Sequence, residues 1–171
     1  MSLNLEFKFD DNTYRHYLNG FLTVLHCHHY LCLTTKAAIQ FEDIGGIDIL
    51  TDTVIDTISP VLKDYIDNNN VETVQEKIDV GVEFYSVMGL GKMQVNITRK
   101  GGQVELLRSH IDRGWIKKWG VTKDNINFFT VGYITAMFSV ATGLLPESFK
   151  VEEISSIVSG EKTSNYIVEK R

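Results

Sequence analysis

The sequence has 171 residues and a formal net charge of −5, which argues against a nucleic-acid-binding surface because affinity for phosphates comes from Lys and Arg. Its two cysteines exclude a disulfide framework, and no apolar run reaches the ~18 residues of a membrane-spanning helix. We therefore expect one cytoplasmic domain over residues 1–171, with no nucleic-acid partner and no membrane span.

The N-terminal part of the chain predicts a short strand and a long helix. Residues 4–9 alternate apolar and polar side chains, as a strand with one covered face does. Over residues 47–66, apolar side chains recur at spacings of three and four with aspartates opposite, which indicates an amphipathic helix. Ser59-Pro60 lies inside this pattern and predicts a kink or a break into two shorter helices, because proline lacks the backbone donor.

A second helix and a hairpin are expected next. Asn70 is the expected cap of this helix, which should end near Gly89. Beyond it the period of the apolar pattern changes from 3.6 to 2, so residues 92–108 are predicted to form an antiparallel hairpin. Gly101 and Gly102 offer the positive-φ residues that its turn needs.

The last part of the chain predicts a buried helix and a second hairpin. After an irregular stretch, Asp124 or Asn125 is placed to cap a helix over about 126–142, which has no polar face and must be enclosed on most sides. Runs at 148–157 and 164–168 predict the final strands. The fold class is therefore α+β: N-terminal helices packed on an antiparallel sheet of hairpins, with a buried aromatic helix before the last two strands.

The densest group of potential metal ligands lies within residues 26–32. Imidazole and thiolate groups suit zinc or another transition metal, and two or three of them share a face in either a helix or a strand. A closed zinc site needs about four ligands, so Glu153, His16, His110 or a second subunit would have to complete it. The alternative is a buried or interface cluster that holds no metal. The candidate ligands are His26, His28, His29 and Cys32.

Three features follow one another in the second half of the chain: the segment 109–120, which we expect to be a loop, the aromatic stretch 127–133, and a strand pair carrying Glu153 and Gly160. In this order, over roughly residues 92–170, they resemble the 4-vinyl-reductase family of hydrocarbon-binding domains. The resemblance implies a homodimer that holds a hydrophobic ligand between helices and sheet. It also implies a fold similar to the ligand-binding domains of nitric-oxide signalling and Golgi transport.

The resemblance further implies where a zinc site would lie and where this chain departs from it. In the aromatic-sensing branch the pattern is Glu, then Cys three residues later, then Gly and another Cys. The matching positions here are Glu153, Ser156, Gly160 and Ser164. Hydroxyl groups replace both thiolates and stay protonated near neutral pH, so this zinc site is expected to be absent.

The expected ligand wall comes from the aromatic helix and from the segment before it. Ligand pockets are lined mostly by apolar and aromatic side chains with a few polar groups, and the resemblance places this helix beside the cavity. Ordinary core packing is the alternative for each of these side chains. The expected ligand-binding residues are Phe128, Phe129, Tyr133, Met137, Trp115 and His110.

A complete catalytic set is not visible in the sequence. His110 and Asp112 can act as an acid and its orienting carboxylate only if their side chains converge on a substrate. Cys27 and His29 lack the third group that would orient a base. Neither a dinucleotide fingerprint nor a phosphate loop is present. The lack of a complete catalytic set favours a binding function, and catalysis is kept as the alternative.

Three functions remain open at this stage. The first is binding or sensing of a small hydrophobic ligand, whether aromatic, lipid-like or tetrapyrrole-like, by a dimer that signals through a separate partner. The second is a metal-binding protein or metal-dependent enzyme centred on residues 26–32. The third is a structural or adaptor dimer that binds no ligand.

Overall fold

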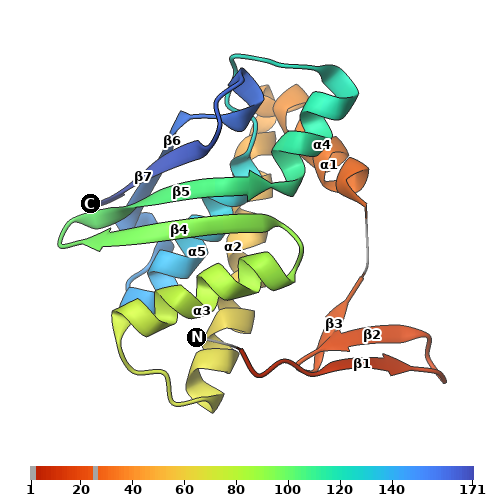
Figure 1. Ribbon diagram of the computed structural model, residues 1–171, viewed down its shortest axis with the longest axis vertical. Coiled ribbons are helices and arrows are strands. Elements are labelled where there is room, and N and C mark those ends of the chain that lie inside the picture. Colours follow the sequence, from red (N-terminus) through yellow and green to blue (C-terminus); the bar gives the residue numbers. More distant parts are fainter. Residues whose placement is uncertain (1–2, 25–26) are drawn as a thin grey trace.

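The computed structural model describes residues 3–24 and 27–171, which form α-helices and two antiparallel sheets (Figure 1). The helices are α1 (His28–Gln40), α2 (Gly46–Asn68), α3 (Val74–Val87), α4 (His110–Trp119) and α5 (Phe128–Thr142). The strands are β1 (Phe7–Asp10), β2 (Arg15–Leu18), β3 (Phe21–Thr23), β4 (Gly91–Thr98), β5 (Gly101–Ser109), β6 (Phe149–Ser155) and β7 (Ser164–Lys170). The predicted α+β class is confirmed. None of the described helices combines the length and apolar character needed to cross a lipid bilayer.

The larger sheet joins the two predicted hairpins in the strand order β4-β5-β7-β6. The hairpin expected over 92–108 is confirmed as β4 and β5, although its turn consists of Arg99 and Lys100 rather than the glycines. Gly101 instead opens β5 with a φ of 136°, and a Cβ at this position would collide with the carbonyl oxygen of Val168 on β7. Glycine is therefore needed for the close approach of these two strands.

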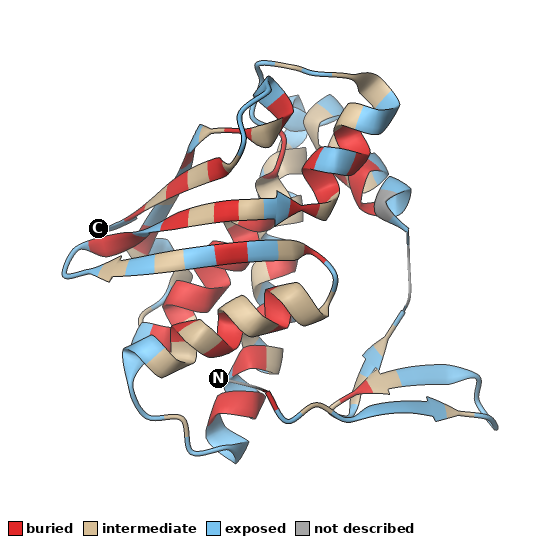
Figure 2. Cartoon of the chain, in the orientation of Figure 1, coloured by how far each residue is buried: buried red, intermediate tan, exposed pale blue. Residues whose placement is uncertain are grey.

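Helix α5 packs between the inner face of this sheet and helix α2, while α3 lies along the edge strand β4 and also contacts α5 (Figures 1 and 2). Its central residues are buried all round, which confirms the prediction of an enclosed helix. Gly132 lets α5 cross α2 closely, because a Cβ there would lie 2.7 Å from the carbonyl oxygen of Thr51. The core of the molecule is thus built around α5, which is covered by the sheet on one side and by helices on the other.

Two helix caps differ from the prediction, and one of the two alternatives at Pro60 is excluded. Helix α2 continues through Pro60 as one helix, so the break into two shorter helices is not found. Helix α3 is capped by Thr73, which exchanges hydrogen bonds with Glu76: each side chain accepts from the other residue's backbone N–H. The expected cap, Asn70, lies ahead of the helix with a φ of 52°. Helix α5 is capped by Asn127, two residues beyond Asn125 and three beyond Asp124, the two expected caps.

The segment 109–120 is mostly helix α4, so the expectation of a loop is wrong. Ser109, the last residue of β5, accepts a hydrogen bond from the backbone N–H of Asp112 at 3.0 Å and so caps the helix directly. Ile111 and Trp115 form the buried stripe of α4 at i and i+4. The strand passes into the helix without a turn. The Gly, Pro or Asn residues that usually mark the boundary between two elements are therefore missing here.

Strands β1, β2 and β3 form a separate sheet, here called the N-terminal arm, which extends to one side of the body (Figure 1). The strand expected over 4–9 is found as β1 at Phe7–Asp10. Leu3 and Leu18 are buried against the core, and the backbone N–H of Asn4 donates to the Tyr65 hydroxyl at 3.0 Å. Most of the rest of the arm is exposed (Figure 2).

Candidate functional site

An apolar groove runs between α1 and α2 and ends at the first turn of α5. It consists of a cavity of about 370 Å³ between the two helices and an adjoining one of about 190 Å³ that Phe129 helps to line. The two cavities share Thr34, Leu50 and Thr53, and we call them together the α1–α2 groove. Their combined size falls within the range of small-molecule pockets, roughly 300–1,000 Å³. Phe129 is the predicted wall residue that lies in this groove.

Two other predicted wall residues, Tyr133 and Met137, pack against α3. The Tyr133 hydroxyl donates to the carbonyl oxygen of Gly81 at 2.7 Å, and its ring meets that of Tyr85 edge to face at 4.9 Å between centroids. A Cβ on Gly81 would lie 2.6 Å from Met137 Cγ, so the two helices are in close contact here. Both side chains are fully buried, and neither lines the α1–α2 groove.

The predicted residues of α4 are His110, at its start, and Trp115, in its middle. His110 begins the helix, half-buried, and its backbone N–H donates to the carbonyl oxygen of Leu90 at 2.8 Å. The Trp115 ring packs against Trp119 with centroids 4.7 Å apart. Lys36 of α1 places its ammonium group 4.5 Å from the centroid of the Trp119 ring, which ties α1 to α4 by a cation–π contact. Phe128, partly buried, opens α5 beside Phe129.

A buried polar network joins α4, α5 and β7 close to the first turn of α5. Asp112, with no exposed surface, accepts hydrogen bonds from Asn127 Nδ2 at 2.8 Å and from Ser164 Oγ at 3.1 Å. Asn127 Nδ2 also lies 3.3 Å from Ser109 Oγ. His110 and Asp112, considered above as an acid and its orienting carboxylate, both lie in the first turn of α4, and the Asp112 carboxylate accepts its hydrogen bonds from Asn127 and Ser164.

A second buried carboxyl group, Glu153 on β6, belongs to the same region. Tyr166 donates its hydroxyl hydrogen to Glu153 Oε1 at 3.2 Å. Burial raises the pKa of Asp112 to about 6 and the pKa of Glu153 to about 7, and the charge of Asp112 adds to the increase at Glu153. The ion pairs among the described residues lie elsewhere, so neither carboxyl group is balanced by a cation in that part of the chain.

The hydroxyl groups at the implied zinc positions make hydrogen bonds within the chain. Ser164 Oγ accepts from the backbone N–H of Ile157 at 2.8 Å while it donates to Asp112. Ser156 Oγ accepts from the backbone N–H of Val158 at 3.2 Å. Glu153 and these two serines therefore occupy a region organised by hydrogen bonds between α4 and the end of the sheet.

The segment proposed to bind a metal is helical from residue 28 onward. His26 lies outside the described residues, and His28 begins α1. His29 is exposed, whereas Cys32 is fully buried and its thiol donates to the carbonyl oxygen of Ile111 at 3.2 Å. Burial raises the pKa of the Cys32 thiol to about 11. Residues 3–24 and 27–171 contain no group of three or more metal-ligating side chains, and the metal site stays a prediction.

Sequence reasoning missed the polar network and one wall of the groove. Asn127 carried a usable signal, because an amide directly ahead of an apolar helix is a favoured cap. Asp112 and Ser164 are 52 residues apart and meet only through the pairing of β5 with β7, which spacing alone does not reveal. The wall of the groove formed by α1 was missed because that helix was not predicted.

Comparison with known proteins identifies the fold. No protein-family model matches the sequence, and no curated protein matches it at a significant level. Among solved structures, the chain is similar to the phenol-responsive sensory domain of the transcription activator PoxR, crystallised with phenol, with a TM-score of 0.76 and 12% identity over 96% of this chain and 84% of that one. The resemblance to the 4-vinyl-reductase family stays a prediction. At this identity the likeness shows the fold alone: the chain has the architecture of this sensory domain.

Proposed function

We propose that the chain is a sensory domain that binds a small, mostly apolar molecule in the α1–α2 groove. The observation that carries the proposal is the groove itself, whose two cavities of about 370 Å³ and 190 Å³ are lined largely by apolar side chains. A site of this kind suits an aromatic or aliphatic ligand with few polar groups. The fold of a phenol-responsive sensory domain supports the same reading.

The polar groups of the groove favour a ligand that donates a hydrogen bond. Thr34 Oγ1 donates its hydrogen to the carbonyl oxygen of Leu31 at 2.9 Å, and Thr53 Oγ1 donates to that of Ile49 at 2.6 Å. Because each hydroxyl has one hydrogen, both oxygens keep only acceptor capacity toward the groove. A ligand with an apolar body and one O–H or N–H group, such as phenol, matches this arrangement.

The position of Phe129 gives the ligand a route to the interior. Phe129 lines the groove, and two residues earlier Asn127 caps α5 and donates to buried Asp112. A ligand that shifts the first turn of α5 would therefore alter the hydrogen bonds of the polar network. We propose that this change is passed to a separate signalling partner.

The second part of the proposal is a homodimer formed through the N-terminal arm. Phe7 and Phe9 lie on one face of the arm, 67% and 46% exposed, together with Phe21. A small sheet needs a covered apolar face to be stable, and its edge strands offer unpaired backbone groups. A second copy presents the same face and the same edges, so a two-fold axis can satisfy both.

Titration calorimetry with phenol tests the binding site. We expect saturable binding by the wild type and at least about tenfold weaker binding by Thr53→Trp, because the indole ring fills the junction of the two cavities from an exposed helix position. Asp52→Trp is the matched control, since its neighbouring exposed position does not line the groove. Equal binding by Thr53→Trp and wild type, with unchanged circular dichroism, would place the ligand elsewhere. No saturation with phenol or with a larger apolar probe would reject the sensory reading.

A further inference from the structure

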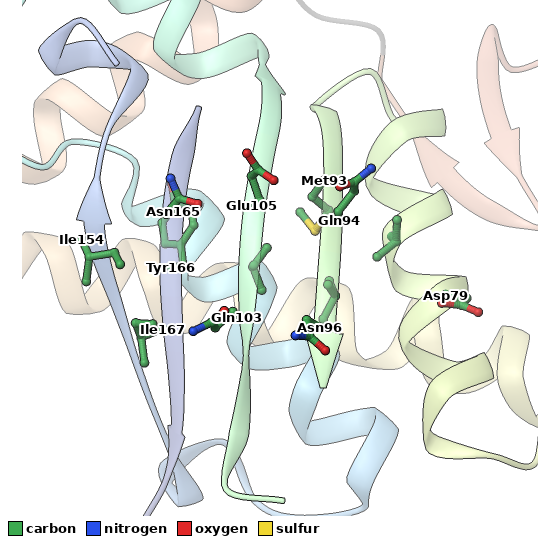
Figure 3. Close-up of a pocket in the computed structure, with 13 residues that line it drawn as sticks. Asp79, Met93, Gln94, Asn96, Gln103, Glu105, Ile154, Asn165, Tyr166 and Ile167 are labelled. Carbon is green, nitrogen blue, oxygen red and sulfur yellow. The ribbon is translucent and has the colours of Figure 1, made fainter. Parts of the chain in front are cut away.

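The outer face of the larger sheet, opposite α5, carries a polar hollow that is separate from the α1–α2 groove. Its volume is about 670 Å³, and its lining comes from α3 and from all four strands of the sheet. Figure 3 shows Gln94, Glu105 and Asn165 across neighbouring strands, with Asp79 on α3 to one side. The register confirms the arrangement, because Glu105 pairs with Gln94 on β4 and with Asn165 on β7.

Amide groups surround the centre of this hollow with spare hydrogen-bonding capacity. The side chains of Gln94, Asn96 and Gln103 make no hydrogen bond to the described part of the chain, so their donors and acceptors are open to a ligand. Asn165 is held in place: its Nδ2 donates to Ser155 Oγ at 2.8 Å. The Oδ1 atom of Asn165 is therefore left as an acceptor.

The charge at the centre of the hollow is unbalanced. Glu105 is half-buried in the middle of the sheet, and its two cross-strand neighbours are amides, which cannot neutralise it. Opposite charges usually stabilise exposed cross-strand pairs, but neither strand beside β5 places a cation opposite Glu105. The lining contains a second carboxylate, Asp79, and neither Lys nor Arg.

We propose that this hollow binds a small organic cation, an amine or a guanidinium compound, with its charged group at Glu105. A charge-assisted hydrogen bond to the carboxylate would supply the missing positive charge, and the amides would hold the remaining polar atoms of the ligand. Ile154 and Ile167 provide an apolar border for a short carbon stem. Divalent metal ions are a poorer match, because they take several oxygen ligands in a compact shell.

Calorimetric titration with 1,4-diaminobutane tests this site, with 1,4-butanediol as the neutral analogue. We expect saturable binding of the diamine, at least about tenfold weaker binding of the diol, and a comparable loss for Glu105→Gln. Glu161→Gln is the control, because this exposed residue lies outside the hollow and its replacement removes the same charge. The control should bind the diamine within about twofold of wild type, since general attraction to an acidic protein is screened by salt.

Each alternative outcome has a defined meaning. Absence of saturation with the diamine, equal binding of diol and diamine, or equal losses in the two variants would overturn the proposal. The ammonium group could also come from a lysine of a partner peptide, so Nα-acetyl-lysine methylamide, whose side-chain ammonium is free, is titrated in parallel. Tighter binding of that compound than of the diamine would assign the hollow to a protein partner and reject a free small cation. Because the hollow and the groove share no residue, failure here leaves the phenol result unaffected.

Discussion

Asp112 and Glu153 place two carboxyl groups in the interior without a cation from the described residues. Their hydrogen bonds come from neutral groups, the Asn127 amide and the hydroxyls of Ser164 and Tyr166. Burying an ionised carboxylate costs more than neutral partners of this kind recover, so the pKa of each carboxyl group is raised and more of its protonated form persists between about pH 5 and pH 7 than in the unfolded chain. The interior therefore holds protons that the unfolded chain would release.

This proton uptake predicts a pH-dependent stability. Burial raises the pKa of Glu153 from 4.5 to about 7, so the stability that it contributes is complete below about pH 4.5 and is lost as the pH rises through about 7. We expect the free energy of unfolding of the wild type to decrease, relative to that of Glu153→Gln, between about pH 5 and about pH 8. Urea unfolding at several pH values measures this difference.

The neighbouring exposed residue supplies the control for this experiment. Glu152→Gln should follow the wild type across the same pH range, because Glu152 lies in water beside Lys150 and not in the interior. If Glu153→Gln kept the full pH dependence of the wild type, Glu153 could not be its source.

At the scale of elements, strong periodicity decided which ones could be predicted. Helix α2 and the β4–β5 hairpin have regular apolar periods and α5 is a long, almost wholly apolar run, and all were expected within a few residues of their observed bounds. Helix α1 has no side-chain cap at Cys27 and contains the β-branched pair Thr34 and Thr35, which weakens a helical pattern. Helix α4 is short and has Gly114 inside it.

These two missed helices explain how much of the site could be predicted. Phe129 was identified because the family resemblance places its apolar helix beside a cavity. The groove itself could not be predicted, because its α1 wall was not recognised as a helix. Tyr133 and Met137 share the apolar character of Phe129, so composition alone does not separate a cavity wall from core packing. Whether a side chain of α5 lines a cavity or packs in the core depends on how α2 and α3 pack against it, and this is a property of the tertiary structure.

We therefore expect replacement by Asp to have different outcomes at two positions of α5, Tyr133 and Phe129. Tyr133→Asp should fail to fold, because it buries an unpaired charge and removes the 2.7 Å hydrogen bond to Gly81. Phe129→Asp, at the partly open groove, should keep its far-UV circular dichroism and lose phenol binding. A folded Tyr133→Asp variant that has lost phenol binding would instead favour a cavity around Tyr133.

At the scale of the whole molecule, the arm divides the chain into a compact body and a small projecting sheet (Figure 1). The body buries its apolar side chains around α5, whereas the arm exposes Phe7 and Phe9 on one face. Exposed aromatic side chains grouped on a projecting element are typical of an interaction surface. The oligomeric state is therefore the property that depends most on the arm.

Sedimentation of an arm variant tests the homodimer. We expect the wild type to sediment as a dimer at micromolar concentration and the double variant Phe7→Glu, Phe9→Glu to sediment as a folded monomer of 19.4 kDa, because the new charges repel across the two-fold axis. The control Val121→Glu, Leu145→Glu changes residues of the body that are 64% and 72% exposed and should remain dimeric. A monomeric wild type would exclude an arm-mediated dimer.

The junction between arm and body also carries a natural attachment point for a spectroscopic label. Cys27, directly before α1, is exposed, whereas Cys32, the other cysteine of the chain, is buried with its pKa raised to about 11 and is protected from thiol reagents. A maleimide dye or nitroxide therefore attaches once per chain without mutagenesis. In a two-fold assembly the two labels define a single distance, which electron paramagnetic resonance between two nitroxides measures.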